Sequence, residues 1–223
     1  MAEQNIKSMQ RIDPFGPYQL AGYSFGAGVV HEMCLQLHKK GLSVQRLIIF
    51  DGLPYFSVCK NTLDDSPVLS KSFFENLMLI SEVLKEFLNQ KELQLEINNE
   101  VLFTKSKEEQ LDMVFDALVK HGFNFMTRTD FYTFVKIYIH QVKIWDTYIP
   151  DINVTHNTPV TLFRADKENE ELTETYGWET VTRGGVIVHR IEGNHMNILS
   201  LPHVESITKT IKAVENVKME AIL

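Results

Sequence analysis

A serine stands between two glycines in residues 22–26, which read Gly-Tyr-Ser-Phe-Gly. The preceding residues 18–21 form a short apolar run that predicts a β-strand. From Gly26 onwards, apolar side chains recur at three- and four-residue steps, which predicts an amphipathic helix. Strand, motif and helix in this order are typical of a nucleophile elbow, a sharp turn that points a serine hydroxyl out of a sheet. The alternative is a glycine-rich turn whose serine only caps the helix.

The elbow hypothesis gives roles to two residues. Ser24 is the candidate nucleophile, and the backbone N–H of Phe25 is a candidate donor to the oxyanion that forms when a carbonyl is attacked. The helix that follows would present its N-terminus to this negative charge. Side chains at positions 22 and 26 are expected to collide with neighbouring backbone, which would explain both glycines.

A serine hydroxyl needs a base to become a good nucleophile, and the chain contains eight histidines. Only His195 lies in a loop just past the last predicted strand, residues 186–191, with Gly193 two positions before it. Parallel sheets carry functional loops at the carboxyl ends of their strands. We therefore predict His195 as the base; the alternative is a solvated loop histidine.

Two aspartates are candidates for the acid that orients the imidazole. Asp51 follows the predicted strand at residues 47–50, and Asp166 follows the one at residues 159–163. Both preserve the chain order serine, acid, histidine, so position alone does not choose between them. If neither acts as the acid, Asp51 is interpreted as a turn residue beside Gly52, and Asp166 as a solvated charge in a loop.

The elements that must position these residues indicate an α/β fold. Residues 18–50 read as strand, helix and strand, a βαβ unit that implies a parallel sheet with a right-handed crossover. Residues 60–150 show helical spacing and no comparable buried strand. We therefore predict a core at residues 1–59 and 151–223, with a helical insertion between them and a final helix from Pro202.

The 223-residue composition excludes several classes of protein. Hydrophobic residues make up 44% and charged residues 23%, which is ordinary for a globular chain, and the net charge of −7 argues against nucleic acid as a partner. Two cysteines cannot build a disulfide framework and fit a reducing compartment. The sequence lacks a secretory signal, an 18-residue apolar run, metal-ligand spacing and a phosphate loop. We expect a cytosolic location, no membrane span, no metal and no bound cofactor.

Four segments, residues 16–27, 31–34, 47–52 and 191–195, resemble the thioesterase domain of animal-type fatty acid synthase, one of the type I thioesterases with an α/β-hydrolase fold. The resemblance implies that Ser24 takes a fatty acyl chain from the phosphopantetheine thioester of an acyl carrier protein, which a longer form of the same polypeptide could contain. Water would then release a free fatty acid. The resemblance also favours Asp51 over Asp166 as the acid.

The resemblance further implies that the helical insertion forms a lid and an acyl groove. Side chains that could line a channel for a long acyl chain are Phe73, Phe74, Met78, Phe131 and Phe134. For each of them, the alternative is ordinary core packing.

The chain departs from the family before the elbow. The family has several strands and helices there, including a loop that supplies a second oxyanion N–H, whereas 17 residues precede the first predicted strand of this chain. We therefore expect a fragment or a truncated form of a longer synthase, with residues 18–21 as an exposed edge strand. Two other functions stay open: a different serine hydrolase such as a carboxylesterase or lipase, and a non-catalytic acyl-binding module.

Overall fold

The computed structural model describes residues 1–55, 73–87, 94–148, 150–151, 154–166 and 172–220. Contacts divide the chain into two compact units. The core unit comprises residues 1–64 and 148–223, and the helical unit comprises residues 65–147. The boundary predicted between residues 59 and 60 lies outside the described residues.

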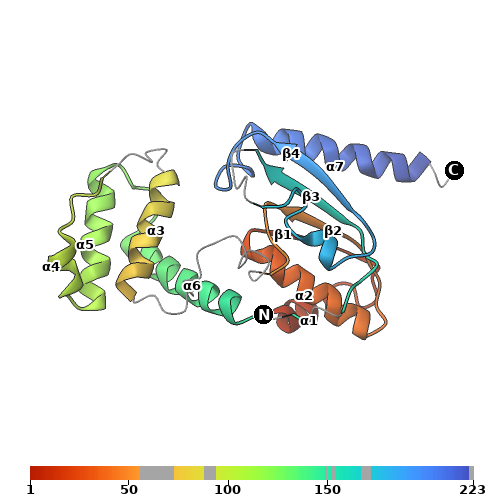
Figure 1. Cartoon of the computed structure of the whole chain (residues 1–223), viewed down its shortest axis with the longest axis horizontal. Helices are drawn as coiled ribbons and strands as arrows, with labels where there is room; N and C mark the ends of the chain where they lie inside the picture. Colours follow the sequence, from red (N-terminus) through yellow and green to blue (C-terminus); the bar gives the residue numbers. More distant parts are fainter. Residues whose placement is uncertain (56–72, 88–93, 149, 152–153, 167–171, 221–223) are drawn as a thin grey trace. The chain divides into compact units, whose positions relative to one another are not determined.

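The core unit is built on a parallel sheet whose four strands lie in the order β1, β2, β3 and β4 (Figure 1). The strands are β1 (Tyr18–Tyr23), β2 (Val44–Phe50), β3 (Val160–Ala165) and β4 (Val186–Ile191). Because all four run the same way, the loops that follow them meet at one edge of the sheet. The predicted α/β fold with a parallel sheet is confirmed.

Helices cover both faces of this sheet (Figure 1). On one face, α1 (Ala2–Gln10) and α2 (Phe25–Lys39) pack on a buried apolar cluster that includes Leu47 and Ile49. On the other face, α7 (His203–Glu220) contributes Ile207 to a second cluster. The alternation of side chains along a strand explains why neighbouring residues of β2 and β3 belong to different clusters.

The structure departs from the predicted elements in several places. Strand β2 begins at Val44, three residues earlier than predicted, and β3 runs to Ala165, two residues further. The helix α1 is absent from the prediction because only two of its residues, Ala2 and Ile6, are buried, and this short stripe is hidden among polar residues. Strand β1 runs to Tyr23, two residues further than predicted. The last helix begins at His203 rather than Pro202.

The helical unit contains α3 (Phe73–Phe87), α4 (Asn99–Phe103), α5 (Lys107–Lys120) and α6 (Arg128–Thr147). Its buried apolar residues come from all four helices. A capping box begins α5: the Ser106 hydroxyl accepts the Glu109 N–H at 3.3 Å, and the Glu109 carboxylate accepts the Ser106 N–H at 2.9 Å. This N-terminal signal was readable in the sequence, whereas the five-residue α4 was not.

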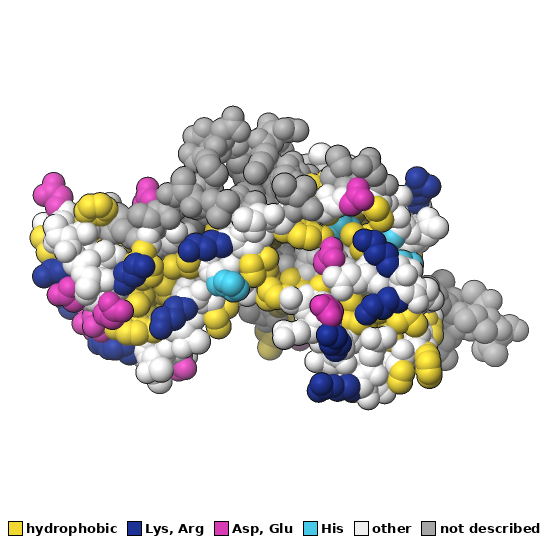
Figure 2. Space-filling model, turned by 90° about the horizontal axis from the view of Figure 1, so that it is seen from below, with side chains coloured by type: hydrophobic (Ala, Val, Ile, Leu, Met, Phe, Trp, Pro, Cys, Tyr) yellow, Lys and Arg dark blue, Asp and Glu magenta, His cyan; other side chains and the backbone are white. Residues whose placement is uncertain are grey.

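Charged side chains of both signs are interspersed on the face of the molecule drawn in Figure 2. Local ion pairs also occur among the described residues, such as Lys7 with Glu3 at 2.7 Å one turn earlier on α1. This face therefore presents mixed charge and not a continuous basic surface.

Candidate active site

Ser24 occupies the sharp turn between β1 and α2. Its backbone angles, φ 51° and ψ −123°, are unfavourable for a residue with a side chain. The turn is held by the sheet, since the Ser24 N–H donates to the carbonyl oxygen of Phe50 at 3.1 Å. Phe25, whose N–H is the candidate oxyanion donor, is the first residue of α2, at the positive end of the helix dipole.

Tight contacts explain one glycine of the motif but not the other. A Cβ added at Gly22 would lie 2.5 Å from the carbonyl oxygen of Gly26, so only glycine fits there. The prediction of a collision at Gly26 is wrong, because an added Cβ meets nothing within 4 Å beyond the neighbouring residues and backbone of its own helix. Gly52, which the sequence marked only as a turn residue, is also constrained: its Cβ would lie 2.6 Å from the Ser24 carbonyl oxygen.

His195 lies in the loop after β4 and bridges the other two candidates. Its Nε2 is 2.8 Å from the Ser24 hydroxyl, although the two residues are 171 positions apart in the chain. Its Nδ1 is 2.7 Å from Oδ2 of Asp51. A serine, a histidine and a buried carboxylate in this arrangement have the geometry of a Ser-His-Asp triad.

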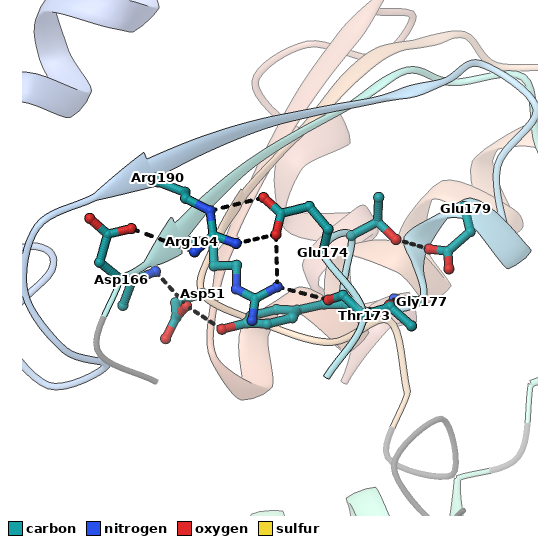
Figure 3. A network of polar contacts seen from close by, with 11 residues as sticks. Asp51, Arg164, Asp166, Thr173, Glu174, Gly177, Glu179 and Arg190 are labelled. Atoms are coloured by element: carbon teal, nitrogen blue, oxygen red, sulfur yellow. Dashed lines mark hydrogen bonds and ion pairs between the residues drawn. The ribbon is translucent and has the colours of Figure 1, made fainter. Parts of the chain in front are cut away.

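The structure places Asp51, and not Asp166, beside His195. The Asp51 side chain is 3% exposed, and its Oδ1 accepts hydrogen bonds from the Ala165 N–H at 2.9 Å and from the Tyr176 hydroxyl at 3.0 Å. Asp166 instead points toward Arg190, with 3.8 Å between their nearest charged atoms (Figure 3). Of the two aspartates that sequence position left open, only Asp51 thus contacts the His195 imidazole among the described contacts.

Two tyrosines contact the triad and were missed by sequence reasoning. The ring of Tyr23 stacks on the imidazole of His195 with 5.0 Å between centroids, and its hydroxyl donates to the His195 carbonyl oxygen at 2.6 Å. Tyr176 donates to Asp51 from the segment between β3 and β4. Tyr23 lies inside the serine motif, which is a weak signal, whereas nothing in the sequence around Tyr176 indicates its role.

The predicted acyl-groove residues lie in the helical unit. Phe131 is fully buried there, with its ring centroid 5.4 Å from that of Phe115, so core packing accounts for its position. Phe73, Met78 and Phe134 are partly buried against the same apolar cluster. The side chain of Phe74 lies outside the described residues.

The buried cysteine of the core unit is a poor nucleophile. Burial raises the pKa of the Cys34 thiol to about 11, so the thiol stays protonated at neutral pH. Its sulfur lies 3.4 Å from the Thr158 hydroxyl and does not contact the triad histidine. The second cysteine, Cys59, lies outside the described residues.

Comparison with known proteins shows the family of this chain. Residues 1–214 match the family model described as Thioesterase domain. The chain belongs to the thioesterase domain family. Indigoidine synthase of Dickeya dadantii (strain 3937) is 26% identical over 225 residues, which cover 95% of this chain and 14% of that protein. Polyketide synthase PksR of Bacillus subtilis (strain 168) is 30% identical over 126 residues, which cover 56% of this chain and 5% of that protein.

A solved structure of a four-domain nonribosomal peptide synthetase, bound to AMP and glycine, shares the fold of this thioesterase chain. The TM-score is 0.76 at 23% identity, over 96% of this chain and 15% of that one. This chain thus spans a small part of the longer proteins that it matches. The comparisons support a thioesterase domain, whereas the animal fatty acid synthase branch is not supported in particular.

None of the helices in the described ranges of this thioesterase chain has both the length and the apolar character needed to cross a bilayer.

Proposed function

We propose that this thioesterase chain releases an acyl group from the phosphopantetheine thioester of a carrier protein, with Ser24 as nucleophile, His195 as base and Asp51 as acid. The observation that carries the proposal is the hydrogen-bonded series from the Ser24 hydroxyl through His195 to the buried Asp51. Membership of the thioesterase family supports the same reaction class.

In the first half of the reaction, Ser24 Oγ attacks the thioester carbonyl carbon while His195 Nε2 accepts the hydroxyl proton. Asp51 stabilises the resulting imidazolium through its contact with Nδ1. The tetrahedral intermediate then collapses, the carbon–sulfur bond breaks, and the phosphopantetheine thiol leaves with the proton from His195. The acyl group is now an ester of Ser24.

The negative oxygen of the tetrahedral intermediate requires a hydrogen-bond donor. The backbone N–H of Phe25 is our candidate because it directly follows the nucleophile and begins α2. At this end of a helix, the dipole favours a developing negative charge.

In the second half, water attacks the acyl ester. His195 takes one proton from the water and returns it to Ser24 Oγ, so a free carboxylic acid leaves and the enzyme is regenerated. Phosphopantetheine belongs to the substrate, so the proposed reaction needs no resident cofactor.

The proposed partner is an acyl carrier protein, in the same polypeptide or in another. The relatives are named as synthases and a synthetase, which supports release of a chain built on such a carrier. We keep a fatty acyl group as the proposed substrate, with Phe73, Phe74, Met78, Phe131 and Phe134 as proposed contacts. A cytosolic location also stays a prediction.

A fluorophosphonate probe tests the nucleophile, because it reacts covalently with an activated serine. We expect labelling of Ser24 in the wild type and its loss in Ser24→Ala, with Ser200→Ala as a control that retains labelling. Unchanged labelling of Ser24→Ala would exclude Ser24 as the nucleophile. A wild-type chain that does not label would favour the non-catalytic alternative.

Substrate class is tested by hydrolysis of acyl groups loaded on a carrier protein. We expect faster release of long acyl chains from the carrier-protein thioester than from simple esters of the same acids. Faster hydrolysis of the simple esters would favour a carboxylesterase or lipase. Release of a peptidyl or polyketide chain in preference to a fatty acyl chain would replace the fatty acyl assignment.

A further inference from the structure

The segment between β3 and β4 donates hydrogen bonds to both residues that directly follow β2, Asp51 and Gly52. From this segment, the Tyr176 hydroxyl donates to Oδ1 of Asp51 at 3.0 Å. Two residues later, the indole N–H of Trp178 donates to the carbonyl oxygen of Gly52 at 2.8 Å. Both aromatic side chains are buried, with exposed fractions of 3% and 0%. Asp51 is therefore held by one hydrogen bond to its side chain and by another to the backbone of the next residue.

Tyr176 reaches Asp51 from an unfavourable backbone conformation. Its φ is 54°, in the left-handed region that residues with a side chain rarely adopt, and Gly177 follows at φ 79°. Such a conformation persists only when the surroundings impose it. A non-glycine residue in the left-handed region, directly beside an active-site carboxylate, indicates that this placement of the ring serves a purpose.

Charged residues fasten the segment next to Tyr176 (Figure 3). The guanidinium of Arg164 lies over the Tyr176 ring, 4.5 Å from its centroid, and donates to the Thr173 carbonyl oxygen at 2.8 Å. Glu174 is ion-paired with Arg190 of β4. A cation over an aromatic face is attractive, more so when desolvated, and Arg164 is almost fully buried.

The two carboxylate oxygens of Asp51 have different hydrogen-bond partners. Oδ1 accepts from the Ala165 N–H and the Tyr176 hydroxyl, and Oδ2 faces Nδ1 of His195. Two donors on Oδ1 fix the plane of the carboxylate, so that Oδ2 is directed at the imidazole. With one donor removed, the carboxylate gains rotational freedom and its contact with His195 weakens.

We propose that Tyr176, supported by Arg164, is a positioning residue for the acid of the triad. It aligns Asp51 with His195 and does not itself contact the reacting atoms. The inference rests on the proposed function in that it assumes a working triad, but the alignment of Asp51 with His195 can be measured without turnover.

The test compares Tyr176→Phe with Tyr18→Phe in the full chain. The first change keeps the ring beneath Arg164 and removes only the hydroxyl. The control removes a hydroxyl from another buried tyrosine of the core unit, one that donates to the Asp13 carbonyl oxygen at 2.9 Å, away from the triad. Urea unfolding of both variants establishes that the measured protein is folded.

Two readouts are compared: the rate of fluorophosphonate labelling at Ser24, and the proton NMR signal of the His195 Nδ1–H hydrogen-bonded to Asp51. We expect Tyr176→Phe to slow labelling about tenfold, less than the roughly 10⁴-fold loss typical when the acid itself is neutralised. The Nδ1–H signal should shift and broaden. Tyr18→Phe should change neither readout.

A folded Tyr176→Phe variant with unchanged labelling and an unchanged Nδ1–H signal would overturn the proposal, as would equal effects in Tyr18→Phe. If the wild type does not label at all, the proposed function fails, while the NMR signal still tests the alignment. If Tyr176→Phe does not fold, the proton NMR signal of the Tyr176 hydroxyl in the wild type tests the proposal instead. This proton should resonate downfield and move in Asp51→Asn, and a signal that does not respond contradicts the inference.

Discussion

Asp51 accepts three hydrogen bonds while almost completely removed from water, one each from a backbone amide, a tyrosine hydroxyl and an imidazole. The types and positions of Ser24 and His195 could be predicted from the sequence because a motif and a strand end mark them. Position along the chain did not separate Asp51 from Asp166, since both follow strands, and only the family resemblance favoured Asp51. Tyr23 carried only a weak signal and Tyr176 none, because side-chain contacts over more than 100 residues leave no local pattern.

Asparagine substitutions at Asp51 and at Asp166, made one at a time, separate the roles of the two aspartates. Asp51→Asn should lower kcat for thioester hydrolysis by about 10⁴-fold, because an amide can neither stabilise the imidazolium nor hold the correct histidine tautomer. Asp166→Asn should change kcat less than about threefold, since only an exposed pairing with Arg190 is lost. Steady-state kinetics of both variants check this, and a large loss confined to Asp166→Asn would reverse the assignment.

The two motif glycines should respond oppositely to alanine. Gly22→Ala places a Cβ 2.5 Å from the Gly26 carbonyl oxygen, so the free energy of unfolding should fall by roughly 1–3 kcal/mol. Gly26→Ala adds a methyl group where nothing lies within 4 Å beyond the neighbouring residues and backbone of its own helix, and within a helix it should raise the free energy of unfolding by up to about 1 kcal/mol. Urea titration measures both, and equal destabilisation would contradict the difference in packing.

Elements with a dense apolar pattern were predictable. Strand β3 is buried at every position, and its apolar residues up to Phe163 made it predictable, although the strand continues through the buried Arg164 to Ala165. Short elements were not: α1 has one buried stripe, and α4 has five residues and depends on the cap at Asn98. Strand β1 lies at the end of the strand order, so its outer edge has no paired strand among the described residues.

A charge on this edge strand should reduce self-association. Ala21 is an exposed position of β1, and lysine at sheet edges opposes strand pairing between molecules. In light scattering over a concentration series, Ala21→Lys should lower the associated fraction relative to the wild type. Its free energy of unfolding, measured by urea titration, should change by no more than about 0.5 kcal/mol. Association that is equal in both proteins would show that the β1 edge is not the contact.

At the scale of the whole molecule, the parallel sheet gathers residues that are 144 and 171 positions apart. The right-handed βαβ connection made this gathering predictable in outline. The core unit also buries a pair of histidines, His31 and His156, whose rings lie 5.6 Å apart. Histidines dispersed along a sequence give no sign that two will become neighbours in a core.

This histidine pair should make stability depend on pH. Burial is the main cause that lowers the pKa of His31 and of His156 to about 4, against about 6.5 in an unfolded chain. Between these values the unfolded chain binds more protons, so the free energy of unfolding should fall as pH decreases from about 6.5 to 4. The loss should approach roughly 3 kcal/mol per histidine at the acid end.

Urea midpoints at pH 7.5, 6.0 and 5.0 measure this dependence. His31→Leu should weaken the pH dependence to the part contributed by His156, whereas His140→Gln, which changes an exposed histidine, should leave it unaltered. A dependence that persists fully in His31→Leu would assign the effect to other groups.

The helical unit is inserted between β2 and β3, which are hydrogen-bonded neighbours in the sheet. Pairing of the two strands therefore fixes where the insert leaves the sheet and where it returns, whatever its length. Doubling the length of a flexible loop adds only about 0.6 kcal/mol to the free-energy cost of closing it. The insert leaves after β2, beside Asp51, and the chain returns to the start of β3 at Val160, whereas Asp51 is bonded to the amide of Ala165 at the far end of β3. The insert can thus change in length while Ser24, Asp51 and His195 keep their hydrogen-bonded places in the core unit.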